Sequence, residues 1–410
     1  MKIVDLCPKV VLPPNTGSRV RIWNLLRHLS EGHEVRLFSQ QRSRSGWREH
    51  LGEMWVTPSY SEIEYSHPAI RLIGNLAEAS RTTIPPLRGA GLAFARPRRL
   101  EALVDWADLL MVEFPWQFAY AHRRRRGKPI VLATHNVEAD RFASVAQAER
   151  GPNASHPWGG WIERVERRAV LAADLVLAVC EEDRAELVRR YGASPDRVVV
   201  VENGVDTSTY VPVDARARRE AKTRLGLPLR PTVLYTGSNT APNRAGLRWV
   251  RRLAERAPHL SFVVVGEVSA GLSGEPFIAP GVVNEMAPFL QAADIAICPI
   301  EFGGGTKIKL LEALGAGLPT VAFPEAAQGL AVRDRDQLRI VGKDEESLVA
   351  ALDELVADDA FAAALGTRAR EYVCARHDWR SISEQVEGLL RALVGESERS
   401  AVPDPRVASV

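Results

Sequence analysis

Short apolar runs alternate with segments of helical periodicity along nearly the whole chain of 410 residues. Fully apolar strands separated by helices are typical of a parallel sheet that helices cover on both faces. The runs interpreted as strands form two groups: 3–7, 34–39, 109–114, 129–134, 175–179 and 198–201, then 232–235, 261–265, 295–299 and 319–323. The sequence therefore predicts an α/β chain with two doubly wound parallel sheets.

The stretch between the two groups differs from both. Residues 211–231 are polar and charged and contain three prolines, so they are predicted to connect two domains through one short helix. A chain of this length is long enough for two domains of ordinary size. Residues 40–60 are predicted to form a loop and a short exposed segment, and residues 396–410 a loose tail.

Composition and the N-terminal residues exclude several classes of protein. Hydrophobic residues make up 46% and charged residues 25%, which indicates a globular chain, and a net charge of +2 gives no reason to expect nucleic acid. No apolar run approaches the roughly 20 residues that span a bilayer. The opening MKIVDLCP is interpreted as a strand rather than a secretion signal, so we expect a cytoplasmic protein.

No C-x-x-C spacing of a zinc site occurs among the four cysteines, Cys7, Cys180, Cys298 and Cys374.

The densest positive block, Arg-Arg-Arg-Arg-Gly-Lys at 123–128, has two interpretations. It can be the solvated end of a helix, because cations are favoured at helix C-termini. It can also contact an anionic lipid surface or a charged acceptor, which would place the protein peripherally at a membrane.

Two loops that follow predicted strands in the first half carry candidate site residues. Ligands of open α/β sheets bind at the carboxyl ends of strands, and a cleft between two sheets is the natural place for a site. Gly17 allows backbone to approach a ligand at a helix N-terminus, although Thr16 or Ser18 could simply cap that helix. His135 directly follows a strand and could bind a substrate hydroxyl or carry a proton.

A glycine-rich loop in the second half concentrates the strongest signals. Three glycines at 303–305 follow a strand and, with Thr306, precede a helix. Their N–H groups and the helix dipole can hold a pyrophosphate. Lys309 and Glu312 are three residues apart and therefore share a helix face, where the acid can accept hydrogen bonds from a ribose diol.

These motifs, in this order, resemble the retaining glycosyltransferases of family 4, which have the GT-B fold. The segments that carry the resemblance are 14–35, with Gly-His-Glu-Val before the second strand, 161–206, which ends in Asn-Gly-Val-Asp, 281–299 and 303–321. The resemblance implies two Rossmann-like domains that face a central cleft. Residues 1–205 would form the acceptor-side domain and 206–378 the nucleotide-sugar domain, and a helix at 379–395 would cross back to the first domain.

The resemblance also implies a role for each candidate residue. His135 would be catalytic and lie near the reacting centre, and Glu312 would hold the ribose. The expected donor-binding residues are Gly17, Gly237, Ser238, Asn243, Val283, Gly304, Gly305, Thr306, Lys307, Lys309 and Glu312. The expected acceptor-side residues are Asn15, Thr16, Asn136 and Glu138.

The chain departs from the family pattern at two places. The first acid of the family's E-x7-E motif falls on Gly304, which puts donor-sugar recognition in question. The arginine and lysine of the first loop of the second domain fall on Ser238 and Asn243. Lys307 and Lys309 are hypothesised to supply the missing positive charge.

The implied reaction moves a hexose from a nucleoside-diphosphate sugar to a hydroxyl of a glycan, a lipid-linked sugar or a small molecule, with retention of configuration. Backbone N–H groups and lysines can stabilise a leaving diphosphate, and no acidic pair is predicted to hold a divalent ion, so we expect no cofactor and no metal. Two alternatives stay open: a sugar-nucleotide epimerase on the same fold, and a non-catalytic homologue that binds a nucleotide sugar.

Overall fold

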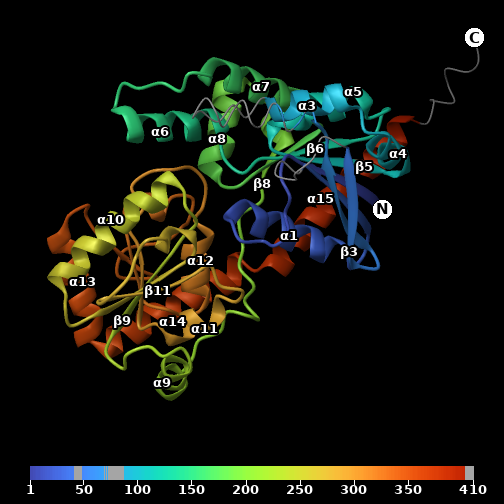
Figure 1. Ribbon diagram of the computed structural model, residues 1–410. Coiled ribbons are helices and arrows are strands. Elements are labelled where there is room, and N and C mark those ends of the chain that lie inside the picture. The colour runs from blue at the N-terminus through green and yellow to red at the C-terminus, as the bar shows by residue number, and fades with distance from the viewer. Residues whose placement is uncertain (41–48, 69, 71, 73–86, 402–410) are drawn as a thin grey trace, which may run out of the picture.

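Two separate sheets organise the chain (Figure 1), as a computed structural model shows for residues 1–40, 49–68, 70, 72 and 87–401. The first sheet has the strand order β3-β4-β2-β1-β5-β6-β7-β8, and its pairs are parallel except for β3 with β4. Its strands are β1 (Lys2–Cys7), β2 (Glu34–Gln40), β3 (His50–Thr57), β4 (Tyr60–Ser66), β5 (Leu109–Glu113), β6 (Ile130–Ala133), β7 (Leu175–Ala178) and β8 (Val198–Val200).

The second sheet is parallel throughout its described pairs and has the order β11-β10-β9-β12-β13-β14. Its strands are β9 (Thr232–Thr236), β10 (Ser261–Val265), β11 (Phe277–Gly281), β12 (Ile295–Cys298), β13 (Thr320–Ala322) and β14 (Arg339–Ile340). Two α/β domains built on parallel sheets confirm the predicted fold class.

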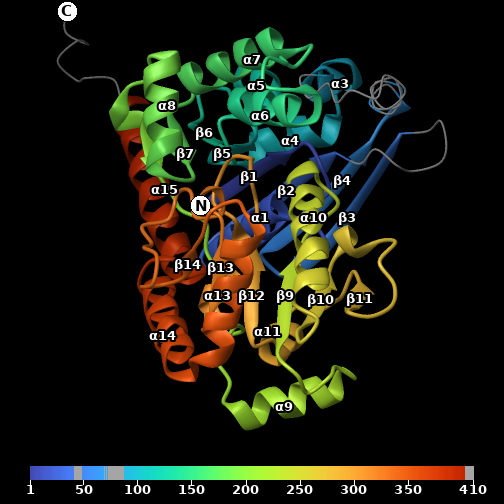
Figure 2. The same ribbon diagram turned by 90° about the vertical axis from the view of Figure 1, so that its left-hand side faces the viewer.

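Helices cover both sheets. Figure 2 shows α10 and α13 in front of the second sheet, and α9 lies at the far end of that domain. The helices of the first domain are α1 (Gly17–Leu29), α3 (Leu87–Ala95), α4 (Arg98–Trp106), α5 (Phe118–Arg124), α6 (Glu138–Arg150), α7 (Gly159–Ala172) and α8 (Glu181–Tyr191). Those that follow are α9 (Ala215–Arg224), α10 (Ala241–Arg256), α11 (Ala287–Ala292), α12 (Ile308–Gly315), α13 (Glu345–Ala357), α14 (Asp359–Arg376) and α15 (Trp379–Ala401). Short 3-10 turns lie at 115–117, 195–197, 267–269 and 324–326.

The first strand shows why its sequence forms a central strand. Val4 and Leu6 belong to the core on one face of the sheet, whereas Ile3 and Cys7 belong to the core under α1 on the other. Side chains alternate along a strand, so Asp5 points to the same face as Ile3 and Cys7. A fully buried acid in this apolar setting is unusual.

The C-terminal helix α15 returns to the first domain and packs against α1. Trp379 at its start is buried in the same core as Ile22 and Leu26 of α1. The start of α15 packs closely against the turn that contains Gly204. A Cβ on Gly204 would lie 2.8 Å from the Trp379 ring and 2.9 Å from the carbonyl oxygen of His377. The glycine of the Asn-Gly-Val-Asp turn is therefore required by packing.

Four parts of the secondary structure differ from the prediction. The loop predicted over 40–60 is wrong for the residues that the structure describes there, because β3 and the start of β4 form an antiparallel pair; 41–48 lie outside the described residues. The strand β3 lies at the sheet edge, and its exposed face gives it the polar pattern of a loop. The prediction also lacks the rest of β4, together with β11 and β14. Finally, α15 continues through Ala401, whereas a loose tail was predicted from 396, and 402–410 lie outside the described residues.

The basic block at 123–128 is largely engaged inside the first domain. Arg124 contacts Glu101 at 2.5 Å and Arg125 contacts Asp174 at 2.6 Å. The ammonium of Lys128 donates to the carbonyl oxygens of Val104 and Asp105 at the end of α4. These contacts favour the interpretation as a helix end. None of the helices in the described ranges is long and apolar enough to cross a bilayer.

Candidate active site

The glycine-rich loop after β12 reaches across to the first domain. Gly305 has a φ of +67°, a conformation that glycine adopts without strain. A Cβ there would lie 2.9 Å from the Asn136 Oδ1 atom and 3.0 Å from the carbonyl oxygen of His135. A Cβ on Gly304 would lie 3.0 Å from the same Asn136 oxygen. Residues predicted in the two halves of the sequence are thus in direct contact.

This contact predicts that Gly305→Ala lowers the free energy of unfolding by more than backbone strain alone would. We expect the free energy of unfolding to fall by about 2–3 kcal/mol, because strain and a clash with Asn136 act together. Gly226→Ala is the matched control, since Gly226 has a φ of +65° and nothing within 4 Å of a Cβ. Its expected loss is only about 1 kcal/mol. Denaturant unfolding of both variants measures the difference, and equal losses would contradict a close contact between the domains.

Thr306 and Lys307 hold the glycine-rich loop from inside. The ammonium of Lys307 donates to the carbonyl oxygens of Gly303, Gly304 and Gly305 at 3.0, 3.2 and 2.5 Å. The hydroxyl of Thr306 accepts from Asn203 at 2.8 Å, and Asn203 accepts from the buried Arg21 of α1 at 2.9 Å. Lys307 is therefore turned into its own loop, and both domains contribute to the position of Thr306.

Lys309 reaches the carboxyl end of β9. Its ammonium donates to the Thr236 carbonyl oxygen and to Asn243 Oδ1, both at 2.6 Å, and lies 5.0 Å from the centre of the Tyr235 ring. All three partners are neutral, and no carboxylate of the described residues forms an ion pair with it. Burial lowers the pKa of Lys309 to about 8. Among the described residues, Lys309 therefore has no carboxylate in direct contact, although Glu312 lines the same pocket.

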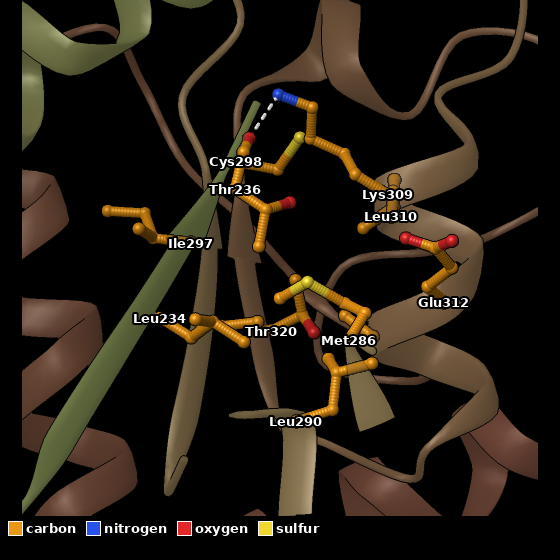
Figure 3. A pocket seen from close by; sticks show the side chains of 12 residues that line it. Leu234, Thr236, Met286, Leu290, Ile297, Cys298, Lys309, Leu310, Glu312 and Thr320 are labelled. Carbon is orange, nitrogen blue, oxygen red and sulfur yellow. Dashed lines mark hydrogen bonds between the residues drawn. The ribbon is translucent and has the colours of Figure 1, made fainter. Parts of the chain in front are cut away.

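Glu312 lies one turn further along α12, and its carboxylate points toward the strands (Figure 3). It lines a pocket together with Lys309, Thr236 and Met286. The Tyr210 hydroxyl donates to its Oε1 atom at 3.4 Å, and burial raises the pKa of Glu312 to about 7. Lys309 and Glu312 are thus brought together at one pocket, as their spacing predicts.

The predicted residues of the first loop in the second domain form the wall beside Lys309. Asn243 donates to the carbonyl oxygen of Ser238 at 2.9 Å, and its own side-chain oxygen accepts from Lys309. A Cβ on Gly237 would lie 2.9 Å from the Asn243 side chain, so only glycine fits there. Val283 is partly buried beside the pocket residue Met286.

The predicted residues near the start of α1 lie close to the start of α12. A Cβ on Gly17 would lie 3.8 Å from the side chain of Ile308, so the N-termini of α1 and α12 approach each other. Each helix N-terminus carries positive potential, so two such termini lie close together here. Thr16 occupies the N-cap position without a side-chain hydrogen bond to the helix, and Asn15 accepts from Arg19 at 2.7 Å.

His135 lies at the end of β6 and is 7% exposed. Its Nε2 atom is 2.5 Å from Glu113 Oε2, and its ring stacks on Phe114 with 4.1 Å between ring centres. Burial, and then the positive charges of Arg21 and Lys9, lower its pKa well below the usual value. His135 is therefore a neutral imidazole near pH 7.

The start of α6 after His135 is held by buried carboxylates. Glu138 contacts Arg141 at 2.7 Å and accepts weakly from Asn136 at 3.3 Å. Glu166 of α7 accepts the backbone N–H groups of Glu138 and Ala139 at 2.7 and 3.1 Å. The predicted acceptor-side residues Asn136 and Glu138 thus belong to one rigid turn beside His135.

Metal-binding residues are scarce among the described residues. The sequence contains one D-x-D triplet, Asp334-Arg335-Asp336, but Asp334 pairs with Arg339 and Asp336 with Arg368. No group of three or more His, Cys, Asp or Glu side chains in the described ranges could hold a metal ion. The triplet is therefore engaged in ion pairs.

Three residues of the site were missed from the sequence: Asp5, Glu113 and Tyr210. Two of them could have been found from the sequence. Asp5 is an isolated acid within an apolar strand, and Glu113 is an acid at the end of another apolar strand. Tyr210 could not, because its contact with Glu312 joins segments 102 residues apart.

Comparisons with known proteins match both halves of the chain. Residues 15–209 match the Glycosyltransferase Family 4 profile and residues 230–358 that of Glycosyl transferases group 1. The chain is 28% identical to a D-inositol 3-phosphate glycosyltransferase of Salinispora arenicola, over 91% of this chain and 86% of that protein. It is 31% identical to an alpha-maltose-1-phosphate synthase of Mycolicibacterium smegmatis, over 75% and 85%. Further D-inositol 3-phosphate glycosyltransferases match over shorter stretches, for example 60% of the protein from Rhodococcus opacus.

Solved structures share the arrangement of the two domains. Sucrose-phosphate synthase from Thermosynechococcus elongatus superposes with a TM-score of 0.75 at 18% identity, over 97% of this chain and all of that chain. HepE of Anabaena, solved with UDP and glucose, gives 0.68 at 12% identity, over 96% and 100%. At this identity the likeness supports the fold, and the sequence relatives support the family. The chain therefore belongs to the family-4, or group 1, glycosyltransferases and has the GT-B fold.

Proposed function

We propose that this glycosyltransferase moves a hexose from a nucleoside-diphosphate sugar to an acceptor hydroxyl, with retention of configuration and without a metal ion. The observation that carries the proposal is the ammonium of Lys309, which lies beside Glu312 in one pocket and contacts only neutral oxygens. A diphosphate is the kind of anion that would complete this arrangement. The relatives' names refer to sugar transfer or sugar-phosphate synthesis, and HepE was solved with UDP.

Each residue of the site would have a different role in this reaction. Lys309, the glycine-rich loop and the α12 N-terminus would stabilise the charge that grows on the leaving diphosphate. Glu312 would accept hydrogen bonds from the ribose hydroxyls, since its carboxylate ionises near neutral pH. His135 would accept or donate one hydrogen bond at the transferred sugar.

The reaction is balanced without a further reactant. The acceptor oxygen bonds to the anomeric carbon while the bond from that carbon to the diphosphate oxygen breaks, and the hydroxyl proton passes to the leaving diphosphate. In a single displacement such as this one, retention requires attack on the face that the diphosphate leaves. The assignment of retention rests on the family resemblance. Lys309, the glycine-rich loop and the α12 N-terminus would supply the positive charge that a metal ion could otherwise supply to the leaving diphosphate. The one D-x-D triplet is held in ion pairs.

A thermal-shift screen against UDP-, GDP-, dTDP- and ADP-glucose, with and without excess EDTA, tests the proposal. We expect one nucleotide to stabilise the fold by about 2.7 kcal/mol at 100 times its dissociation constant, with no effect of EDTA. NMR of the products then reads the anomeric configuration. An epimerised sugar from donor alone would indicate an epimerase instead, and no stabilisation by any of the four would contradict nucleotide-sugar binding.

A further inference from the structure

Two buried carboxylic acids, Glu113 and Asp5, lie on the inner side of His135. Glu113 ends β5 and is 1% exposed, and Asp5 of the neighbouring strand β1 is fully buried. The Glu113 carboxylate lies 2.5 Å from His135 Nε2. Neither oxygen of Asp5 has a hydrogen-bond donor among the described residues. A core needs no such cluster for stability, because burying acids is unfavourable unless they are paired.

The hydrogen bonds around the imidazole define which atom can meet a substrate. Nε2 is bound to Glu113, and the stacked ring of Phe114 fixes the plane of the imidazole. A neutral imidazole has one N–H group, and a carboxylate can only accept. When Glu113 is ionised, the proton therefore lies on Nε2, and Nδ1 keeps the lone pair.

We propose that Glu113 is a positioning residue for sugar transfer: it holds His135 with Nε2–H directed inward and leaves Nδ1 to accept a hydrogen bond from a sugar hydroxyl. A protonated Asp5 donates to Glu113 and keeps it in place. The inference rests on the proposed function only in assigning the hydroxyl to a sugar.

Asp5 is assigned the protonated form because an ionised Asp5 would be a buried charge with no donor. As a neutral acid it has one O–H group, and Glu113 is the neighbouring acceptor. Burial, and next the negative charge of Glu113, raise the pKa of Asp5 well above its usual value, in agreement with this assignment. For Glu113, burial raises the pKa to about 7, while Arg21 and Lys9 act in the opposite direction.

These protonation states make the turnover depend on pH. The Glu113 carboxylate is present above about pH 7 and is lost as pH falls below it, so kcat should fall on the acid side. Other charged or titratable groups also face this cluster, namely Asp5, Cys7, Lys9, Arg21, Glu138 and Arg141. Glu113→Gln should remove the acid-side decrease in kcat, since its amide does not titrate.

The experiment compares the full-length protein with Glu113→Gln, Glu113→Ala and Asp5→Asn. The substrate is the nucleotide glucose that gives the largest thermal shift, and its slow hydrolysis is followed without acceptor. We expect kcat to fall by about 10-fold in Glu113→Gln and about 10²-fold in Glu113→Ala, while KM changes less than about 3-fold. Asp5→Asn replaces the hydroxyl donor toward Glu113 by a weaker amide donor, so we expect its kcat to fall, but by less than in Glu113→Gln. Equal kcat and the same acid-side decrease in Glu113→Gln would overturn the inference.

NMR of the labelled histidines separates this inference from the proposed function, because it needs no substrate. The His135 signal, assigned through its loss in His135→Gln, should show a proton on Nε2 that is strongly deshielded and protected from exchange. That signal should persist in Asp5→Asn and disappear in Glu113→Ala. A proton on Nδ1, or an unchanged spectrum in Glu113→Ala, would refute the positioning role even if sugar transfer is confirmed. Wild-type protein that shows this signal but neither binds nor hydrolyses a donor would refute the proposed function alone.

Discussion

Replacing Lys309 by methionine is expected to stabilise the ligand-free protein and to weaken donor binding by about 10²-fold. The buried ammonium contacts two neutral oxygens and has no anionic partner among the described residues, so its removal relieves a desolvation penalty. The same ammonium is the positive charge nearest the pocket, so its loss leaves the diphosphate without a counter-charge. Unfolding in denaturant and calorimetric titration with the donor measure the two effects.

Lys222→Met is the matched control for this result. Lys222 is also buried, but its ammonium contacts the Asp294 carboxylate at 2.5 Å. Its removal takes away the closer of the two cations that pair with Asp294, the other being Arg218 at 3.9 Å. It should therefore destabilise the protein, with no effect on donor affinity. Destabilisation of similar size in both variants would contradict the view that Lys309 lacks a counter-charge.

The lowered pKa of Lys309 predicts a pH dependence with a definite sign. In the folded protein its pKa of about 8 lies below the usual lysine value of 10.5, which we assign to the unfolded chain. Between these values the unfolded state binds more protons, so Lys309 makes stability increase with pH in this window. Donor affinity should instead decrease above about pH 8, because the diphosphate binds the protonated form. Both dependences should vanish in Lys309→Met.

Replacing His135 by alanine is expected to lower kcat by about 10²–10³-fold while donor affinity changes little. The imidazole is held by Glu113 and Phe114 at the other side of the cleft from Lys309 and Glu312. Its hydrogen bond should therefore matter at the transferred sugar rather than at the nucleotide. Steady-state kinetics together with a direct binding measurement separate these contributions.

His259→Ala serves as control for His135→Ala. His259 also pairs with a carboxylate, since its Nε2 atom lies 3.0 Å from Asp353 Oδ1. It is half exposed and precedes the amino end of β10, whereas the candidate site lies at carboxyl ends of strands. We expect wild-type kinetics for this variant. A large decrease in donor affinity in His135→Ala, with unchanged kcat, would contradict the assigned role.

The two-sheet fold was predictable because strands buried on both faces of a parallel sheet consist of short, continuous runs of apolar residues. The runs at 3–7, 109–114 and 261–265 agree with β1, β5 and β10 to within a residue at each end. The edge strand β3 was not predictable in this way, since one of its faces meets solvent and its composition resembles a loop. Patterns of local sequence report burial, and they become uninformative where burial is partial.

Within the site, contacts between residues close in sequence were predictable, whereas contacts between distant segments were not. Lys309 and Glu312 lie on one helix, so their spacing was sufficient to bring them to one pocket. The inward turn of Lys307 and the link from Arg21 through Asn203 to Thr306 depend on how distant segments pack. The same holds for the pairing of Glu113 with His135, because two parallel strands had to be placed side by side before the acid could reach the ring.

A crystal structure of the wild-type protein with the nucleotide sugar selected by the screen would test the central claim most directly. We expect the diphosphate to contact the Lys309 ammonium and the backbone of 303–306, with the ribose hydroxyls on the Glu312 carboxylate. A nucleotide bound elsewhere, with Lys309 still held only by Thr236 and Asn243, would contradict it.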